Sequence, residues 1–114
     1  MRDYKEYKNI TDYNKDFQSN KLEQVIRLLH NSGNLQEPEK LVIRTKKPLI
    51  TQARRMVALV ARMKYNIAGS VIAQRLNLNE SQVFAIIYTG FERCKVDDEY
   101  RAEIEELLKK LQCA

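Results

Sequence analysis

The amino-acid sequence predicts an all-α protein, folded as a small helical bundle that contains a helix-turn-helix. Apolar residues recur at intervals of three and four in several separate segments, which is typical of amphipathic helices. No stretch alternates apolar and polar residues with period two over the length of a strand. The 114 residues are enough for a modest core. We expect an arm and a helix in residues 1–43, followed by a helix-turn-helix domain in residues 44–114.

The first predicted helix spans Asn20 to Asn31. Asn20 is the expected N-cap, Glu23 lies three residues later, and Gly33 follows the end of the helix. Its apolar stripe consists of Leu22, Val25, Ile26, Leu28 and Leu29.

The segments on either side of this helix lack helical periodicity. Residues 34–48 contain both prolines of the chain, so we expect a connecting loop there. Residues 1–18 are polar, and two interpretations of them stay open: a loosely ordered arm whose tyrosines pack on the domain, or a segment that docks onto a protein partner. The aromatic residues interleaved in this arm are Tyr4, Tyr7, Tyr13 and Phe17.

A longer helix is predicted from Thr51, as its cap, to about Tyr65. Its apolar residues recur at helical spacing, which gives it one face for the core. A last helix is predicted from Asp97 to Leu111, with acidic residues in its first turn and lysines in its last, as the helix macrodipole favours. The core residues expected from these two helices are Ala53, Met56, Val57, Val60, Met63, Tyr100, Ile104, Leu107, Leu108 and Leu111.

Between these two helices, the segment from Gly69 to Tyr88 has the apolar pattern of a helix-turn-helix. Asn77 lies at the predicted turn, where a positive φ angle favours Gly or Asn. Asn79 is then the expected N-cap of a second helix, in a capping box with Gln82, and this helix is expected to reach about Cys94. The apolar positions that fix the crossing of the two helices are Ile72, Ala73, Leu76, Leu78, Val83 and Ile86.

The basic residues are unevenly distributed along the chain. The net charge is +5, but the 40 residues from Lys40 to Asn79 contain nine basic side chains and no acidic one. A solvated surface normally mixes both signs, so this run indicates a surface that binds a polyanion. A membrane is the competing polyanion, but no segment approaches 18 apolar residues, so nucleic acid is favoured and no membrane partner is expected. The nine residues are Lys40, Arg44, Lys46, Lys47, Arg54, Arg55, Arg62, Lys64 and Arg75.

Residues 44–112 carry an ordered series of features: a basic loop, an arginine-bearing helix, a helix-turn-helix, a long helix and a last helix with an acidic start. The residues that stand out in it are the run Arg54-Arg55-Met56-Val57-Ala58, the pair Ala61-Arg62, and Asn66, Ile72 and Val83. This series resembles the C-terminal DNA-binding domain of the bacterial replication initiator DnaA, which has a Trp-repressor-like fold. The resemblance implies that Arg54 enters the minor groove of DNA and that Lys46 and Lys47 contact phosphates.

The chain departs from that family at the start of the second helix of the helix-turn-helix. The Arg-Asp-His-Thr-Thr run of the family is replaced by Leu78-Asn79-Glu80-Ser81-Gln82, with a turn one residue shorter, so only the hydroxyl of Ser81 is kept. The ATPase domain of the family has no counterpart here, because no Gly-rich phosphate loop is present.

These observations predict a sequence-specific double-stranded DNA-binding protein that regulates transcription or replication initiation. The second helix of a helix-turn-helix enters the major groove with its N-terminal residues on the base edges, so the expected base-reading residues are Glu80, Ser81, Gln82 and Ala85. The residues expected on phosphates or in the minor groove are Arg44, Lys46, Lys47, Arg54, Arg55 and Arg62.

One alternative stays open, an adaptor that binds the initiator or RNA polymerase without reading DNA. Glu80 favours it, because a carboxylate near the groove repels phosphate. The sequence leaves the oligomeric state undetermined.

Other functions lack the residues they need. With His30 as the single histidine, no metal cluster, cofactor site or catalytic set can be assembled, so we expect a protein that is not an enzyme. The N-terminal segment is charged and has no apolar stretch, so we expect no signal peptide and a cytoplasmic, nucleoid-associated protein. Cys94 and Cys113 are then expected to be free thiols.

Overall fold

The computed structural model describes residues 15–112, and within that range the chain is all-helical, without strands. The predicted fold class, an all-α helical bundle, is therefore confirmed. The elements are α2 (Lys15–Asn31), a 3₁₀-helix η1 (Pro38–Val42), α3 (Pro48–Tyr65), α4 (Gly69–Leu76), α5 (Glu80–Val96) and α6 (Asp98–Gln112). The tyrosines predicted in the N-terminal arm (Tyr4, Tyr7 and Tyr13) and Cys113 lie outside the described residues.

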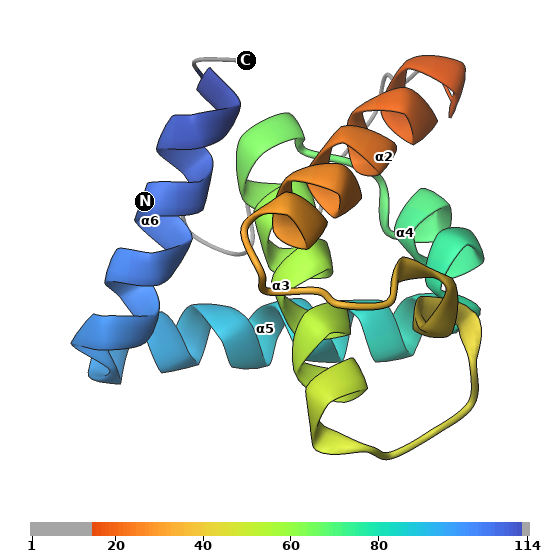
Figure 1. Cartoon of the computed structure of the whole chain (residues 1–114). Helices are drawn as coiled ribbons and strands as arrows, with labels where there is room; N and C mark the ends of the chain where they lie inside the picture. The colour runs from red at the N-terminus through yellow and green to blue at the C-terminus, as the bar shows by residue number, and fades with distance from the viewer. Residues whose placement is uncertain (1–14, 113–114) are drawn as a thin grey trace.

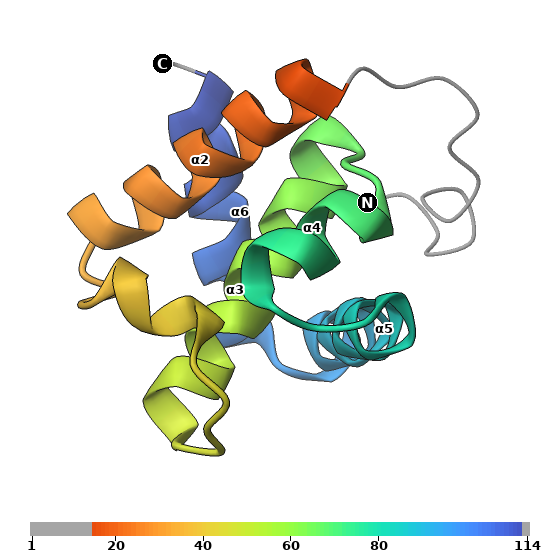
Figure 2. The same ribbon diagram turned by 90° about the vertical axis from the view of Figure 1, so that its right-hand side faces the viewer.

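Helix α3 is the centre of the bundle, because it packs against α2, α5, α6 and η1. Figure 1 shows α5 running across α3, with α6 and α4 on opposite sides of it. Turned by 90°, the molecule shows α4 in front of α3 and α5 seen almost end-on (Figure 2). The loop between η1 and α3 lies beside the α4–α5 turn, at the end of the molecule away from α6.

The core is continuous across the predicted domain boundary at residue 43. Leu22, Val25 and Leu29 of α2 are buried in the same cluster as Val57 of α3 and Ile104 of α6. Within the described part of the chain, residues on both sides of the predicted boundary therefore share one core. The apolar stripe of α2 is too wide to remain in solvent, so it packs on α3, α4 and α6 as part of one unit.

Two helices begin earlier in the structure than the sequence predicted from their expected N-cap residues. Helix α3 starts at Pro48 with Lys47 as its N-cap, which places Thr51 inside the first turn. Proline is favoured at the first position of a helix, because it lacks the N–H that would stay unpaired there. Helix α2 starts at Lys15, so Asn20 lies within it and Phe17 belongs to its first turn rather than to an arm. The expected loop of residues 34–48 also contains η1.

The turn between α4 and α5 has the local structure that its asparagines predicted. Asn77 ends α4 in the left-handed region, with φ of 57°. Asn79 caps α5: its side chain accepts a hydrogen bond from the backbone N–H of Gln82 at 2.8 Å, and the Gln82 side chain accepts one from the Asn79 N–H at 2.9 Å. Both halves of the capping box are therefore formed, and they fix where α5 begins.

Two close approaches hold α5 against its neighbours. A Cβ atom at Gly90 would lie 2.9 Å from Leu59 of α3, and one at Gly69 would lie 2.8 Å from the ring of Phe84. Since real Cβ atoms essentially never come so close, both glycines allow helix crossings that larger residues would push apart.

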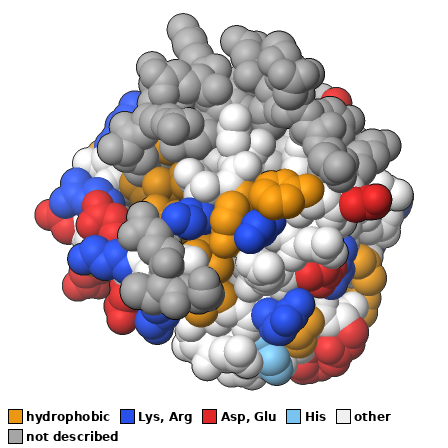
Figure 3. Space-filling view, turned by 90° about the horizontal axis from the view of Figure 1, so that it is seen from above, with side chains coloured by type: hydrophobic (Ala, Val, Ile, Leu, Met, Phe, Trp, Pro, Cys, Tyr) orange, Lys and Arg blue, Asp and Glu red, His pale blue; other side chains and the backbone are white. Residues whose placement is uncertain are grey.

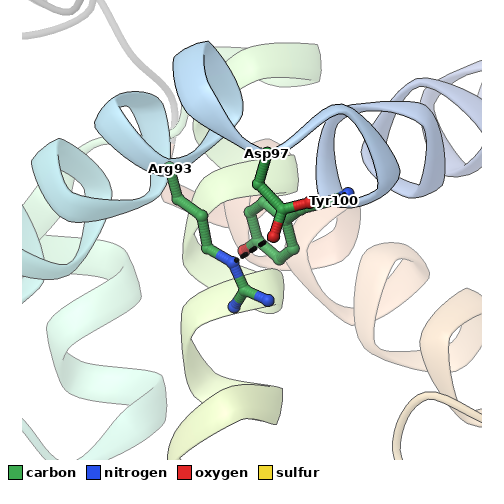
Figure 4. A network of polar contacts seen from close by, with 3 residues as sticks. All are labelled: Arg93, Asp97 and Tyr100. Atoms are coloured by element: carbon green, nitrogen blue, oxygen red, sulfur yellow. Dashed lines mark hydrogen bonds and ion pairs between the residues drawn. The ribbon is translucent and has the colours of Figure 1, made fainter.

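A cluster of three side chains sets the junction between α5 and α6 (Figure 4). Asp97 accepts a hydrogen bond from the backbone N–H of Tyr100 at 3.1 Å, which caps the start of α6. Arg93 donates to the other oxygen of Asp97 at 3.4 Å, and its guanidinium lies 4.0 Å from the centre of the Tyr100 ring. The hydrogen bond from the Tyr100 N–H, and to a smaller extent that from Arg93, lowers the pKa of Asp97.

Candidate nucleic-acid interface

Arg54 fixes the basic loop between η1 and α3. Its guanidinium donates hydrogen bonds to the backbone oxygens of Leu41, at 2.8 Å, of Thr45, at 3.4 Å, and of Ile43. The planar fork of an arginine suits such a set of acceptors, which a lysine could not reach together. Arg54 therefore determines the path of residues 41–45.

Arg54 does not have the exposed position that minor-groove binding needs. Its side chain is 7% exposed, and burial lowers the pKa of its guanidinium. An arginine stays charged in proteins in spite of such a shift, so its positive charge is held by carbonyl oxygens of the loop. Arg54 is thus not placed for the predicted minor-groove contact in this structure, because three of its donors already bond backbone oxygens inside the protein.

Arg62 is also buried, which contradicts its predicted role on phosphates. It is 1% exposed and donates to the backbone oxygen of Ile67 at 2.7 Å. Its guanidinium lies 5.5 Å from the centre of the Phe84 ring, a cation–π distance. Arg62 therefore links the end of α3, the following turn and α5, and it is shielded from any DNA backbone.

Arg55 is exposed but lies on another side of α3. Burial raises the pKa of the Tyr100 hydroxyl, and the positive charge of Arg55 is among the nearby charges that oppose this rise. Arg55 is thus close to α6, and it does not line the hollow beside the basic loop. The structure therefore does not bring Arg55 together with Arg44 and Lys46 at this hollow.

Three cations of the loop remain exposed: Arg44, Lys46 and Lys47. Their loop is held at its start, because Asn77 of the α4–α5 turn donates to the backbone oxygen of Val42 at 3.1 Å. Within the loop, the backbone N–H of Lys47 donates to the Thr45 hydroxyl at 3.2 Å. The basic loop is therefore attached to the turn that precedes α5.

A hollow of about 860 Å³ separates the basic loop from the start of α5. Arg44, Lys46 and Arg54 line one side of it, and the α4–α5 turn and Gln82 line the other. Two predicted phosphate-binding residues, Arg44 and Lys46, are thus brought next to one predicted base-reading residue, Gln82. The complete lining is Arg44, Thr45, Lys46, Arg54, Asn77, Leu78, Asn79 and Gln82.

The four predicted base-reading residues, Glu80, Ser81, Gln82 and Ala85, are all exposed on α5. For Gln82 the structure changes the predicted chemistry. A bidentate contact with adenine needs both the oxygen and the nitrogen of its amide, but the oxygen already accepts from the Asn79 N–H. While the capping box is intact, a bidentate contact would therefore have to share the amide oxygen between the Asn79 N–H and adenine, and only the amide nitrogen is unshared.

The remaining cations of the acid-free run do not extend the surface of the basic loop. Lys40 pairs with Glu37 at 2.9 Å, and Arg75 pairs with Glu23 of α2. Acidic residues outside the run therefore pair with two of its members, Glu37 locally and Glu23 from a distant segment. Basic and acidic side chains are also interspersed on the face seen in Figure 3, as on an ordinary solvated surface.

Sequence reasoning missed the residues that position the site. Thr45 and Asn77 contribute through hydrogen bonds to the loop, and Arg54 contributes through buried donors. Asn77 was identified only as a turn residue, and nothing in the sequence indicates that its side chain reaches Val42. Such contacts join residues up to 35 positions apart, so only the folded chain shows them.

Comparisons with protein-family models, curated proteins and solved structures return no match to this chain. None of the helices within residues 15–112 is long and apolar enough to cross a membrane. In the same range, no three side chains of His, Cys, Asp or Glu come together as a metal site.

Proposed function

We propose that this protein binds duplex DNA sequence-specifically, with the basic loop on the phosphate backbone and the start of α5 in the major groove. The observation that carries the proposal is the hollow between Arg44 and Lys46 on one side and the first turn of α5 on the other. This arrangement joins non-specific charge with a projecting helix end, which are the two parts that helix-turn-helix proteins use.

The phosphate contacts follow from charge and exposure. Arg44, Lys46 and Lys47 project from a loop that internal hydrogen bonds hold in place, so they lose little conformational freedom on binding. The positive end of the α5 macrodipole borders the same hollow and favours an anion there. A DNA strand that follows the basic loop would bring a phosphate into this hollow.

The base contacts use the exposed face of α5. Ser81 offers a hydroxyl, Gln82 offers its amide nitrogen, and Glu80 can accept from the exocyclic amine of cytosine. Thr89 uses its hydroxyl to bond the backbone oxygen of Ala85 at 2.8 Å. The methyl groups of Ala85 and Thr89 are then left on this face, and they suit contact with thymine methyl groups.

The resemblance to the DNA-binding domain of DnaA agrees with this mode in its order of elements, although the two buried arginines differ from what it implied. The proposal gives the protein a role in regulating transcription or replication initiation, at the nucleoid in the cytoplasm. A helix-turn-helix dimer would select two half-sites about one helical turn apart, and a monomer would select one.

Selection of duplexes from a random library tests the proposal. We expect an enriched motif for the chain, and a changed base preference at one position for Ala85→Gln. The matched control is Lys109→Gln, an exposed substitution on α6 that should select the original motif. A library that shows no enrichment, together with no retention of the chain on random duplex even at low salt, would rule out DNA binding.

A second candidate is an adaptor that binds another protein with the same surface. Glu80 lies exposed at the start of α5, and the neighbouring loop exposes Ile43 and Val42, which suit a protein partner better than phosphates. Glu80→Gln distinguishes the two. Removal of a carboxylate should strengthen non-specific duplex binding if α5 faces DNA, and leave it unchanged if α5 faces a protein.

A further inference from the structure

A second cavity lies on the other side of the basic loop. It has a volume of about 410 Å³ and separates the segment after α2 from the first turns of α3. Buried Leu35, Leu41 and Ala53 line it together with Ile50, and Leu49 lies 77% exposed at its edge. This volume is within the range of small-molecule sites, and the apolar lining favours a ligand with an apolar body.

The charges at this cavity favour an anionic ligand. Two lysines and one glutamate line it. Lys40 and Glu37 form an ion pair at 2.9 Å and neutralise each other. Lys47 is exposed, and none of the ion pairs found within residues 15–112 includes it. One positive charge beside an apolar cavity complements one carboxylate on an apolar body.

Lys47 also belongs to the basic loop that we propose for phosphate binding. The loop therefore runs between two hollows: Lys47 and Pro48 line the apolar cavity, and Arg44 and Lys46 line the hollow beside α5. A carboxylate paired with Lys47 would compete with a DNA phosphate for the same ammonium group. It would also place a negative charge beside the DNA backbone.

We propose that the apolar cavity binds a small carboxylate with an apolar body, and that the bound carboxylate weakens binding of duplex DNA. The second half rests on the proposed function, whereas the first does not. Loss of one phosphate contact lowers duplex affinity about eightfold at 0.1 M salt. We expect that loss when the cavity is saturated.

Octanoate is the probe, titrated into the full chain without DNA and followed by amide chemical shifts. We expect saturable shifts in residues 33–41 and 47–53, and weaker binding of 1-octanol, which has the same body without the charge. Lys47→Met should lower octanoate affinity about threefold, the value of an exposed ion pair. Leu49→Ser should also weaken it, whereas Val96→Ser, an equally exposed apolar residue at the end of α5, should not.

Duplex affinity is then measured with and without octanoate. The wild-type chain should lose affinity, and the Lys47→Met chain, which has no ammonium group to be competed for and binds octanoate more weakly, should lose less. Absence of shifts at the cavity, or equal binding of octanoate and octanol, would overturn the ligand site whatever the result with DNA. Unchanged duplex affinity at saturating octanoate would overturn the competition. A chain that binds octanoate and no duplex at all would refute the proposed function and the competition, and leave the ligand site supported.

Discussion

The cations of α3 and those of the basic loop are close in sequence but lie in opposite environments. Arg54 and Arg62 are buried, and three donors of Arg54 and one donor of Arg62 bond backbone oxygens of the protein. Arg44, Lys46 and Lys47 are exposed on a loop whose path Arg54 determines. The first group shapes the surface and the second group supplies its free charge.

The difference shows that a run of basic residues without acids does not by itself define a binding surface. A residue on a helix faces the core or the solvent according to its angular position, and Arg54 and Arg55 are adjacent in sequence but about 100° apart around α3. Acidic residues outside the run also pair with two of its members, Lys40 and Arg75. Less than half of the nine cations therefore contribute to the basic loop.

The largest effect is expected for Arg54→Met. It removes the donors to three backbone oxygens and leaves the loop unsupported, so the free energy of unfolding should fall by about 3 kcal/mol. Denaturant unfolding measures this loss. Arg54→Lys keeps the positive charge but loses the planar set of guanidinium donors, so it should be nearly as destabilising. If Arg54→Met were as stable as the wild type, the division between shaping and charge-supplying cations would fail.

Lys47→Ala should show the reverse behaviour. Duplex affinity should fall about eightfold at 0.1 M salt for every sequence, with a salt slope about one unit lower. The free energy of unfolding should change by less than about 0.5 kcal/mol, as for most surface substitutions. Fluorescence anisotropy at several salt concentrations measures the affinity, with Lys109→Ala as the charge-matched control. A loss confined to one target sequence would contradict phosphate binding.

Arg55→Ala removes an exposed cation that lies on α3 near α6, outside the basic loop. We expect duplex affinity to change by less than about twofold at 0.15 M salt, where charges more than about 8 Å from the DNA are largely screened. The same anisotropy titration measures it. A loss as large as that for Lys47→Ala would mean that the DNA-binding surface continues past α3 toward α6.

The smallest effect is expected at the junction of α5 and α6, where Arg93 is exposed but partnered. The backbone N–H of Tyr100 holds the pKa of Asp97 below its usual value of 3.8, so the ionised form stabilises the fold. This contribution is present above that usual value and is lost as the pH falls through the lower folded-state pKa. Asp97→Asn keeps a capping side chain without the charge.

We therefore expect Asp97→Asn to be slightly less stable than the wild type at pH 7. The difference should disappear as the pH falls below 3.8, which denaturant unfolding at several pH values measures. A difference that stays constant down to acidic pH would show that the charge of Asp97 does not contribute.

The sequence predicted the parts of the fold that depend on neighbouring residues. The positive φ angle of Asn77 and the capping box of Asn79 and Gln82 involve residues within one helical turn, so local chemistry decides them. The apolar spacing also identified the buried faces of the helices, including Ile72 and Val83. The predicted starts of α2 and α3 were too late. Residues that favour N-caps, such as Asn20 and Thr51, also occur inside helices, and Pro48 in fact occupies the first position of α3.

The candidate site was predicted less well than the fold. The sequence identified the basic loop and the exposed start of α5, since both are continuous segments. Gln82 also has two predicted roles, in the capping box and in base reading, and only the hydrogen-bond geometry shows that both roles need the same amide oxygen.

By itself, the sequence determined the helical class, the turn before α5 and the excess of positive charge in residues 40–79. The tertiary structure alone decided which of those charges are available to a partner. Carbonyl oxygens of residues 41–45 accept hydrogen bonds from Arg54, and the carbonyl oxygen of Ile67, in the turn after α3, accepts one from Arg62. Burial of a charged guanidinium is costly unless it finds hydrogen-bond acceptors, and folding brings those of Arg54 from a separate segment of the chain, residues 41–45.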